Sequence, residues 1–122
     1  IRDRLVLLDI NGEITALKNT KTTIHAPGLV AGNHLYQPVI EKNEPKLAKF
    51  ELPQEQDSNF EQIFKVNLSQ SVNSSPVLFG ESIYTACLKG HIYCHNQKGQ
   101  IMAKIELDGL FFQSPKMLIV SI

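Results

Sequence analysis

The chain has 122 residues, so its length predicts one domain or less. Twelve Lys and Arg residues balance twelve Asp and Glu residues, which gives a formal net charge of zero. Nucleic acids and anionic membranes are bound through clustered positive charge, so this balance argues against both partners. Hydrophobic residues make up 43% of the chain, which is enough for a folded core and too many for a disordered tail.

No apolar run approaches the ~18 residues that a transmembrane helix needs, so no such helix is expected. The chain opens at Ile1 without Met and without the apolar stretch of a signal peptide, so no targeting signal is expected there. The two cysteines, Cys87 and Cys94, are too few for a disulfide-stapled module, and we expect buried free thiols. Such thiols fit a reducing cytoplasm better than an oxidising compartment.

Strand signals recur along the chain, whereas helix signals are nearly absent. Residues 4–10 form a short apolar run, which Asn11 and Gly12 separate from a second run at 13–17. Asn-Gly is the strongest two-residue signal for a β-hairpin, because both central positions of a type I′ turn need positive φ. The next four strands are expected at 28–31, 34–40, 46–52 and 61–68, with turns at 41–45 and 53–59.

The second half of the chain continues the same pattern. Residues 82–88 and 91–95 predict a hairpin around Lys89 and Gly90. Residues 96–99 then turn the chain into a last strand at 100–107. Short strands at this spacing, separated by turn residues, predict an all-β chain.

The strands belong to a repeat. The segment that begins at Ser75-Pro76 resembles the segments at Ala26-Pro27 and Ser114-Pro115. Residues 63–68 also match residues 102–107, and residues 11–14 match residues 98–101. A period near 40 residues with four strands in each unit is the signature of a β-propeller blade.

The repeat divides the chain into antiparallel four-stranded propeller blades. We expect a half blade at 1–22, complete blades at 23–68 and 69–107, and the start of another blade at 108–122. The total is about three blades, whereas a closed propeller has about four to eight. We therefore expect a fragment of a larger propeller. Alternatively, copies of the chain associate through their exposed sheet edges, a C-terminal strand completing the half blade of a neighbour.

The spacing of the repeat resembles that of a known family. Ser75-Pro76, then Gly-x-x-Ile-Tyr at 80–84, Gly-x-Ile-Tyr at 90–93 and a turn glycine before an apolar strand are similar to pyrroloquinoline-quinone-like, or quinoprotein-type, propeller repeats. Residues 92–99 look most like the repeats appended to some acyl-activating enzymes. The β-propeller lipoprotein of bacterial outer-membrane assembly has similar repeats. The resemblance implies a fold that serves many functions.

The chain departs from that family at one position. Typical repeats carry a Trp a few residues after the turn glycine, where it docks one blade on the next, but Ala16 and Ala103 stand there and the chain has no Trp. Quinone-binding members also resemble one another in a Trp beneath the cofactor and in acidic and amide ligands to calcium, and we place none of these. Pyrroloquinoline quinone is therefore not expected, and we assign no catalytic, cofactor-binding or metal-binding residue.

The densest group of reactive side chains lies on one predicted hairpin: Cys87, His91, Cys94 and His95. With Lys89 and Gly90 as a two-residue turn, alternation places both cysteines on one face with Thr85 and Ile92, and both histidines on the other face. This arrangement disfavours a mixed zinc site. The cysteines would form a diagonal pair, whose Cα separation tends to exceed the range of a disulfide.

Other candidate groups have simpler interpretations. Ser74 and Ser75 precede a proline that opens a strand, and no Gly-x-Ser-x-Gly elbow marks either as a nucleophile. The polar loop at 54–59 is expected to be solvated, with a recognition loop as the alternative. The pair Phe111-Phe112 is expected at a contact between blades. Three aspartates and five glycines are expected in turns, and their spacing matches no motif that binds calcium or phosphate: Asp9, Asp57, Asp108, Gly12, Gly32, Gly80, Gly90 and Gly99.

These observations predict a non-catalytic propeller scaffold or protein-interaction module within a larger protein. Its partner would be another protein or the rest of the parent propeller. One alternative is a fragment of a quinone-dependent alcohol or sugar dehydrogenase. The other is an accessory propeller of an acyl-activating enzyme.

Overall fold

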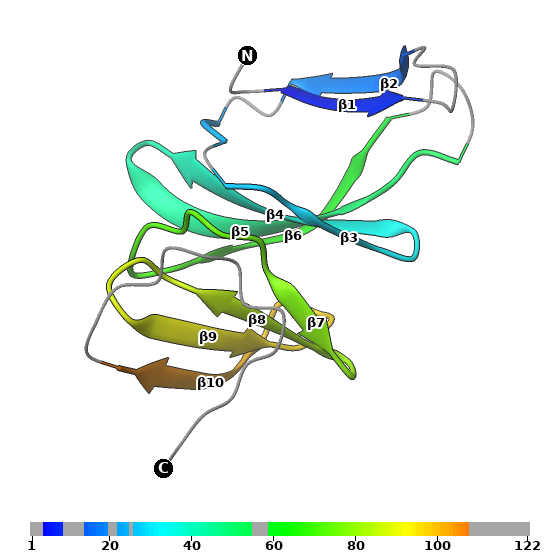
Figure 1. Ribbon diagram of the computed structural model, residues 1–122. Coiled ribbons are helices and arrows are strands. Elements are labelled where there is room, and N and C mark those ends of the chain that lie inside the picture. Colours follow the sequence, from blue (N-terminus) through cyan, green and yellow to red (C-terminus); the bar gives the residue numbers. More distant parts are fainter. Residues whose placement is uncertain (1–3, 9–13, 20–21, 25, 55–58, 108–122) are drawn as a thin grey trace.

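The computed structural model describes residues 4–8, 14–19, 22–24, 26–54 and 59–107 (Figure 1). These residues form ten β-strands and no helix, which confirms the all-β prediction. Accordingly, none of them belongs to a helix long and apolar enough to cross a membrane.

The strands form two four-stranded antiparallel sheets and a hairpin. The hairpin pairs β1 (Arg4–Leu8) with β2 (Ile14–Asn19). The first sheet has the order β3 (Leu29–Ala31), β4 (His34–Glu41), β5 (Glu44–Glu51), β6 (Glu61–Asn67). The second sheet has the order β7 (Val77–Phe79), β8 (Ser82–Ala86), β9 (His91–His95), β10 (Ile101–Glu106).

The three units stack as layers, with the first sheet between the hairpin and the second sheet (Figure 1). Side chains alternate along β4, so Leu35 and Tyr36 point to opposite faces of the first sheet. One face joins Leu5 of the hairpin in a core made of Leu5, Leu35, Val39, Ala48, Phe50 and Phe60. The other face packs on the second sheet in a core made of Ala26, Tyr36, Leu47, Phe64, Leu68, Val72, Ile83, Cys87 and Tyr93. Consecutive antiparallel meanders stacked face to face are arranged as adjacent propeller blades are.

The turn between β4 and β5 is tighter than the predicted turn at 41–45. It consists of Lys42 and Asn43, both with positive φ (50° and 66°), as in a type I′ hairpin. Pro45 lies inside β5, paired with Ile40. The prediction was wrong because proline usually marks a turn. Here the carbonyl of Pro45 accepts from Leu68 N–H on the β6 side, so its missing N–H removes no bond to β4.

The β8–β9 hairpin differs from its prediction by one residue. Cys87 N–H donates to the carbonyl oxygen of His91 at 2.7 Å, and Gly90 N–H donates to that of Cys87 at 3.2 Å, so the turn has three residues, Leu88, Lys89 and Gly90. Gly90 has a φ of 101°, which closes a turn of this length.

A one-residue shift changes which side chains share a face. The observed pairs, including Thr85 with Tyr93 and Tyr84 with Cys94, put the two cysteines on opposite faces. The predicted grouping of Cys87 with Cys94 was therefore wrong. The face toward the first sheet carries Ile83, Thr85, Cys87, His91, Tyr93 and His95. The other face carries Tyr84, Ala86, Ile92 and Cys94.

Each layer contains a β-bulge at the same place in the repeat. The extra, unpaired residue is Thr15 in β2, Ile63 in β6 and Met102 in β10. Ile63 and Met102 are equivalent in the match of 63–68 with 102–107, and Thr15 and Met102 each directly follow the match of 11–14 with 98–101. A bulge bends the edge of a sheet and increases its twist, so the repeat extends to this local irregularity. The division of the chain into blades at 1–22, 23–68, 69–107 and 108–122 stays a prediction.

Candidate functional site

The two ends of the stacked sheets differ. At one end, which we call the open end, the β4–β5 turn, the β6–β7 connection and the β8–β9 turn surround a hollow of about 250 Å³. At the other end, which we call the closed end, the β9–β10 turn packs against side chains of the first sheet. The hollow of the open end is lined by Pro45, Ser69, Gln70, Ser71, Leu88 and Lys89.

Backbone hydrogen bonds hold the floor of the hollow. Leu68 N–H donates to the carbonyl oxygen of Pro45 at 2.9 Å, and Leu88 N–H donates to that of Ser71 at 2.7 Å. The β6–β7 connection is therefore tied to both sheets, although it is not itself part of a strand. A loop tied in this way presents its side chains in a fixed geometry.

Side chains of the second sheet add to this attachment. Ser69 N–H donates to the hydroxyl of Tyr93 at 3.0 Å, and His91 N–H donates to Gln70 Oε1 at 3.2 Å. Ser69 Oγ lies 2.6 Å from His91 Nδ1. His91 and Tyr93 alternate along β9, so both lie on the face that is turned toward the first sheet.

His91 lies between Ser69 and Glu106, but this geometry is not that of an activated nucleophile. The distance from His91 Nε2 to Glu106 Oε1 is 3.8 Å, which exceeds a hydrogen bond. The same oxygen lies 3.3 Å from Lys104 Nζ, and this bond raises the pKa of Lys104. A general base needs a partner that orients its ring, and here the carboxylate is bound to the lysine. We therefore treat the Ser69–His91 contact as one that positions the connection.

At the closed end, two polar side chains of the first sheet bind one glutamine. Tyr36 hydroxyl donates to Gln97 Oε1 at 2.5 Å, and Lys49 Nζ donates to Gln97 Oε1 at 2.9 Å and to its carbonyl oxygen at 3.1 Å. Lys49 is only 4% exposed, and burial lowers its pKa. Burial likewise raises the pKa of Tyr36. Gln97 in turn donates to the carbonyl oxygen of Glu81 at 2.8 Å, so the contact extends into the β7–β8 turn.

An aromatic ring completes the closed end. Phe64 lies against Gly99, where an added Cβ would be 2.7 Å from its Cγ. Phe64 is equivalent to Ala103 in the repeat, at the position where Trp stands in the quinoprotein-type repeats that the sequence resembles. The sequence prediction missed this residue because it compared only the positions after Gly12 and Gly99. Extending the match of 63–68 with 102–107 would have found it.

The cysteines and His95, in contrast, lie inside the protein. Cys87 and Cys94 are both free and buried, as predicted. Burial raises the pKa of Cys87 to about 11, and burial lowers the pKa of His95. Within the residues that the structure describes, no three His, Cys, Asp or Glu side chains are placed to hold a metal ion.

Ser74 and Ser75, which the sequence raised as candidate nucleophiles, are buried and half-buried in the fold, respectively. Ser75 Oγ donates to the carbonyl oxygens of Gly28 at 3.1 Å and Pro76 at 3.3 Å, which links the two sheets. Ser74 is 2% exposed, and its Oγ has no hydrogen-bond partner in the described part of the chain. Outside the described residues lie the Asn11-Gly12 turn, most of the polar loop, three aspartates and an aromatic pair: 55–58, Asp9, Asp57, Asp108, Phe111 and Phe112.

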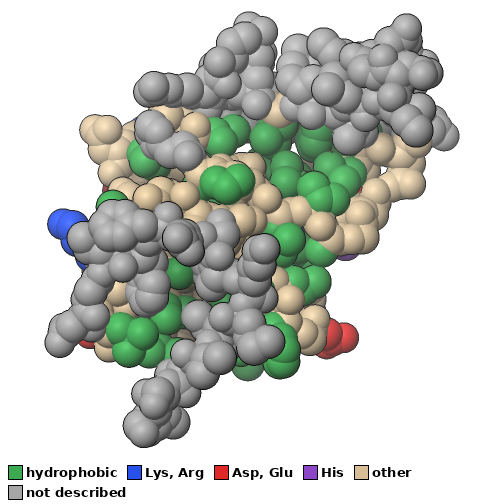
Figure 2. Space-filling view, in the orientation of Figure 1, with side chains coloured by type: hydrophobic (Ala, Val, Ile, Leu, Met, Phe, Trp, Pro, Cys, Tyr) green, Lys and Arg blue, Asp and Glu red, His purple; other side chains and the backbone are tan. Residues whose placement is uncertain are grey.

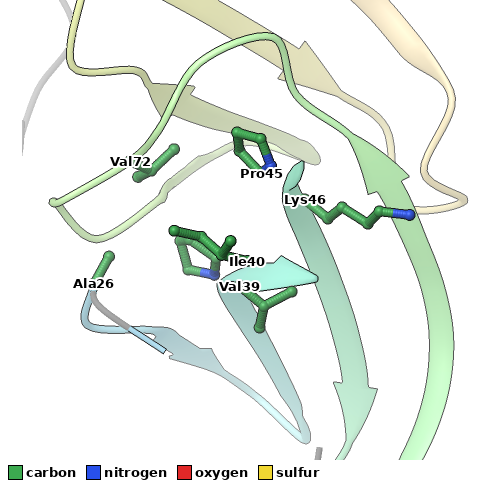
Figure 3. A pocket seen from close by; sticks show the side chains of 7 residues that line it. Ala26, Val39, Ile40, Pro45, Lys46 and Val72 are labelled. Atoms are coloured by element: carbon green, nitrogen blue, oxygen red, sulfur yellow. The ribbon is translucent and has the colours of Figure 1, made fainter. Parts of the chain in front are cut away.

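A second cavity lies between the two sheets below the β4–β5 turn. Its volume is about 10 Å³, which is room for one water molecule at most. Figure 3 shows Val72 and Ala26 on one side of it and Pro45 and Ile40 on the other. It is a packing defect rather than a ligand site.

No protein-family model and no curated protein matches this sequence. Among solved structures, the chain is similar to BamB from Moraxella catarrhalis, with 14% sequence identity and a TM-score of 0.48. The match covers 92% of this chain and 45% of that protein, so the chain spans less than half of its length. The quinone-dependent and acyl-activating alternatives, and the expectation that no quinone binds, stay predictions.

Proposed function

We propose that this chain is a non-catalytic propeller scaffold that binds other protein through its sheet edges and end loops, as part of a larger protein. One observation supports this most directly. Every large hydrophobic side chain that is exposed, among the described residues, lies on an edge strand or directly after one. They are Val30 on β3, Ile63 on β6, Phe79 on β7, Ile101 and Met102 on β10, and Leu107.

Exposed apolar side chains on a strand edge attract another chain, because the edge also presents unpaired N–H and C=O groups. The bulges at Ile63 and Met102 interrupt the regular pairing of two of the edge strands, β6 and β10. The pairings of β3 and β7 run without a register shift. Val30 is 61% exposed and Phe79 is 72% exposed on these two strands. Figure 2 shows hydrophobic side chains that reach the surface of both sheets.

The experiment measures whether another protein chain covers these edges. Light scattering of the purified chain over a range of concentrations should show association. Hydrogen exchange should show that the protection of the β3 and β7 edge amides increases as association increases. The double variant Val30→Thr and Phe79→Ser should stay monomeric with an unchanged circular dichroism spectrum. A monomer at every concentration, with edge amides exchanging at the unprotected rate, would contradict the proposal.

A further inference from the structure

The hollow of the open end has an unusual combination of lining residues. Four of its six residues carry hydrogen-bond donors: Ser69, Gln70, Ser71 and Lys89. The other two, Pro45 and Leu88, are apolar, and none is acidic. Because the connection beneath it is fixed by hydrogen bonds to both sheets, the hollow is formed before any ligand arrives.

One of these donors, the Gln70 amide, is directed by a contact already described, and another, Lys89, has no ion-pair partner among the described residues. Gln70 Oε1 accepts from His91 N–H, so the amide nitrogen is the end of that side chain left free to donate. Lys89 is exposed in the β8–β9 turn and has no carboxylate partner within the part of the chain that the structure describes.

The described acidic side chains nearest the open end form ion pairs with other lysines. Glu44 lies 3.9 Å from Lys46, and Glu106 is bound to Lys104. Glu41 is bound to Lys46 at 3.4 Å and to Lys65, whose hydrogen bond is the main cause of its lowered pKa. Among the residues that the structure describes, the positive charge of Lys89 is therefore not offset by a neighbouring carboxylate, and the hollow is complementary to a negative group.

We propose that this hollow binds the Glu or Asp side chain of an acidic peptide segment in a partner protein. Lys89 and the hydroxyl of Ser71 donate to the carboxylate, together with the Gln70 amide, and Pro45 and Leu88 contact an apolar neighbour of the acidic residue. A volume of about 250 Å³ lies below the range of whole small-molecule sites, which begins near 300 Å³, and fits a side chain. The inference rests on the proposed function, because it names the chemistry of the protein partner.

The test uses fluorescence anisotropy with a fluorescein-labelled Leu-Glu-Glu-Leu peptide. The chain should bind it saturably and should bind the Leu-Gln-Gln-Leu peptide at least tenfold more weakly. Lys89→Glu should weaken binding of the acidic peptide by about tenfold or more, and Ser71→Ala by a smaller factor, with both effects reduced at high salt. The matched control is Lys98→Glu, which changes an exposed lysine at the closed end and should leave binding unchanged.

Equal affinity for the two peptides, or equal losses in Lys89→Glu and Lys98→Glu, would overturn the inference. So would the absence of any binding. If the peptide fails to bind while association through Val30 and Phe79 persists, only the hollow loses its assignment and the proposed function stands. If both measurements fail, the proposed function fails with it.

Discussion

The two ends of the sheet stack join the same two layers in different ways. At the closed end, Phe64 covers Gly99 and the buried Lys49 binds Gln97, so direct contacts join the two sheets. At the open end, the sheets are joined through a polar connection, and a hollow remains beside Ser69 and Lys89. The comparison separates two tasks. Packing at the closed end holds the layers together, and the open end keeps the hollow that we propose as a binding site.

The largest effect is expected from the ring at the closed end. Phe64→Ala should lower the free energy of unfolding by about 3–5 kcal/mol, the usual cost of truncating a buried phenylalanine, because the cavity would open between the sheets. Urea unfolding followed by circular dichroism measures this. Ile63→Ala is the matched control, since the neighbouring bulge residue is 44% exposed. Similar losses in both variants would mean that the ring does not join the layers.

The next effect concerns the glycine beneath that ring. Gly99→Ala should cost roughly 1–2 kcal/mol for the left-handed backbone alone, and more because the added methyl meets Phe64. Gly80→Ala is the control: Gly80 has a φ of 62° with nothing within 4 Å of an added Cβ, so it carries only the backbone cost. Thermal unfolding of both variants gives the difference. Equal losses would show that close packing at Gly99 contributes nothing.

A smaller effect should appear as a pH dependence. Burial lowers the pKa of His95 in the folded protein, whereas the unfolded chain takes up the proton near pH 6.5. Stability from this residue is therefore present above pH 6.5 and lost as the pH falls from 6.5 toward the folded pKa. His95→Phe keeps a ring to stack on Tyr93 and should reduce that dependence. Urea unfolding at pH 7.5 and 5.5 measures the change, and an unchanged slope would contradict it.

The smallest effects are expected at the open end. Ser69→Ala removes the contact with His91 and should cost about 0.5–1.5 kcal/mol, the net value of one hydrogen bond. Lys89→Glu should change stability by less than about 0.5 kcal/mol, as a surface substitution. Chemical unfolding measures both. A loss at Ser69 as large as that at Phe64 would remove the distinction between the two ends.

Much of the fold could be predicted from local patterns. The runs that became β4 and β9 were recognised within one or two residues, because alternation and turn residues act over short distances. The β8–β9 register was not, because Lys89 and Gly90 fit a turn of two residues or of three. Packing of Cys87 and Tyr93 against the first sheet accompanies the longer turn. One residue of difference then moved Cys94 to the other face.

The sequence by itself determined the strand repeat and the approximate place of each turn, since both depend on residues close together in the chain. Only the tertiary structure decided which side chains meet between the layers. Lys49 and Gln97 are 48 positions apart, and Ser69 and His91 are 22 positions apart. Contacts of that separation arise when two sheets stack, so their geometry follows from the packing of whole layers and leaves no local pattern in the sequence.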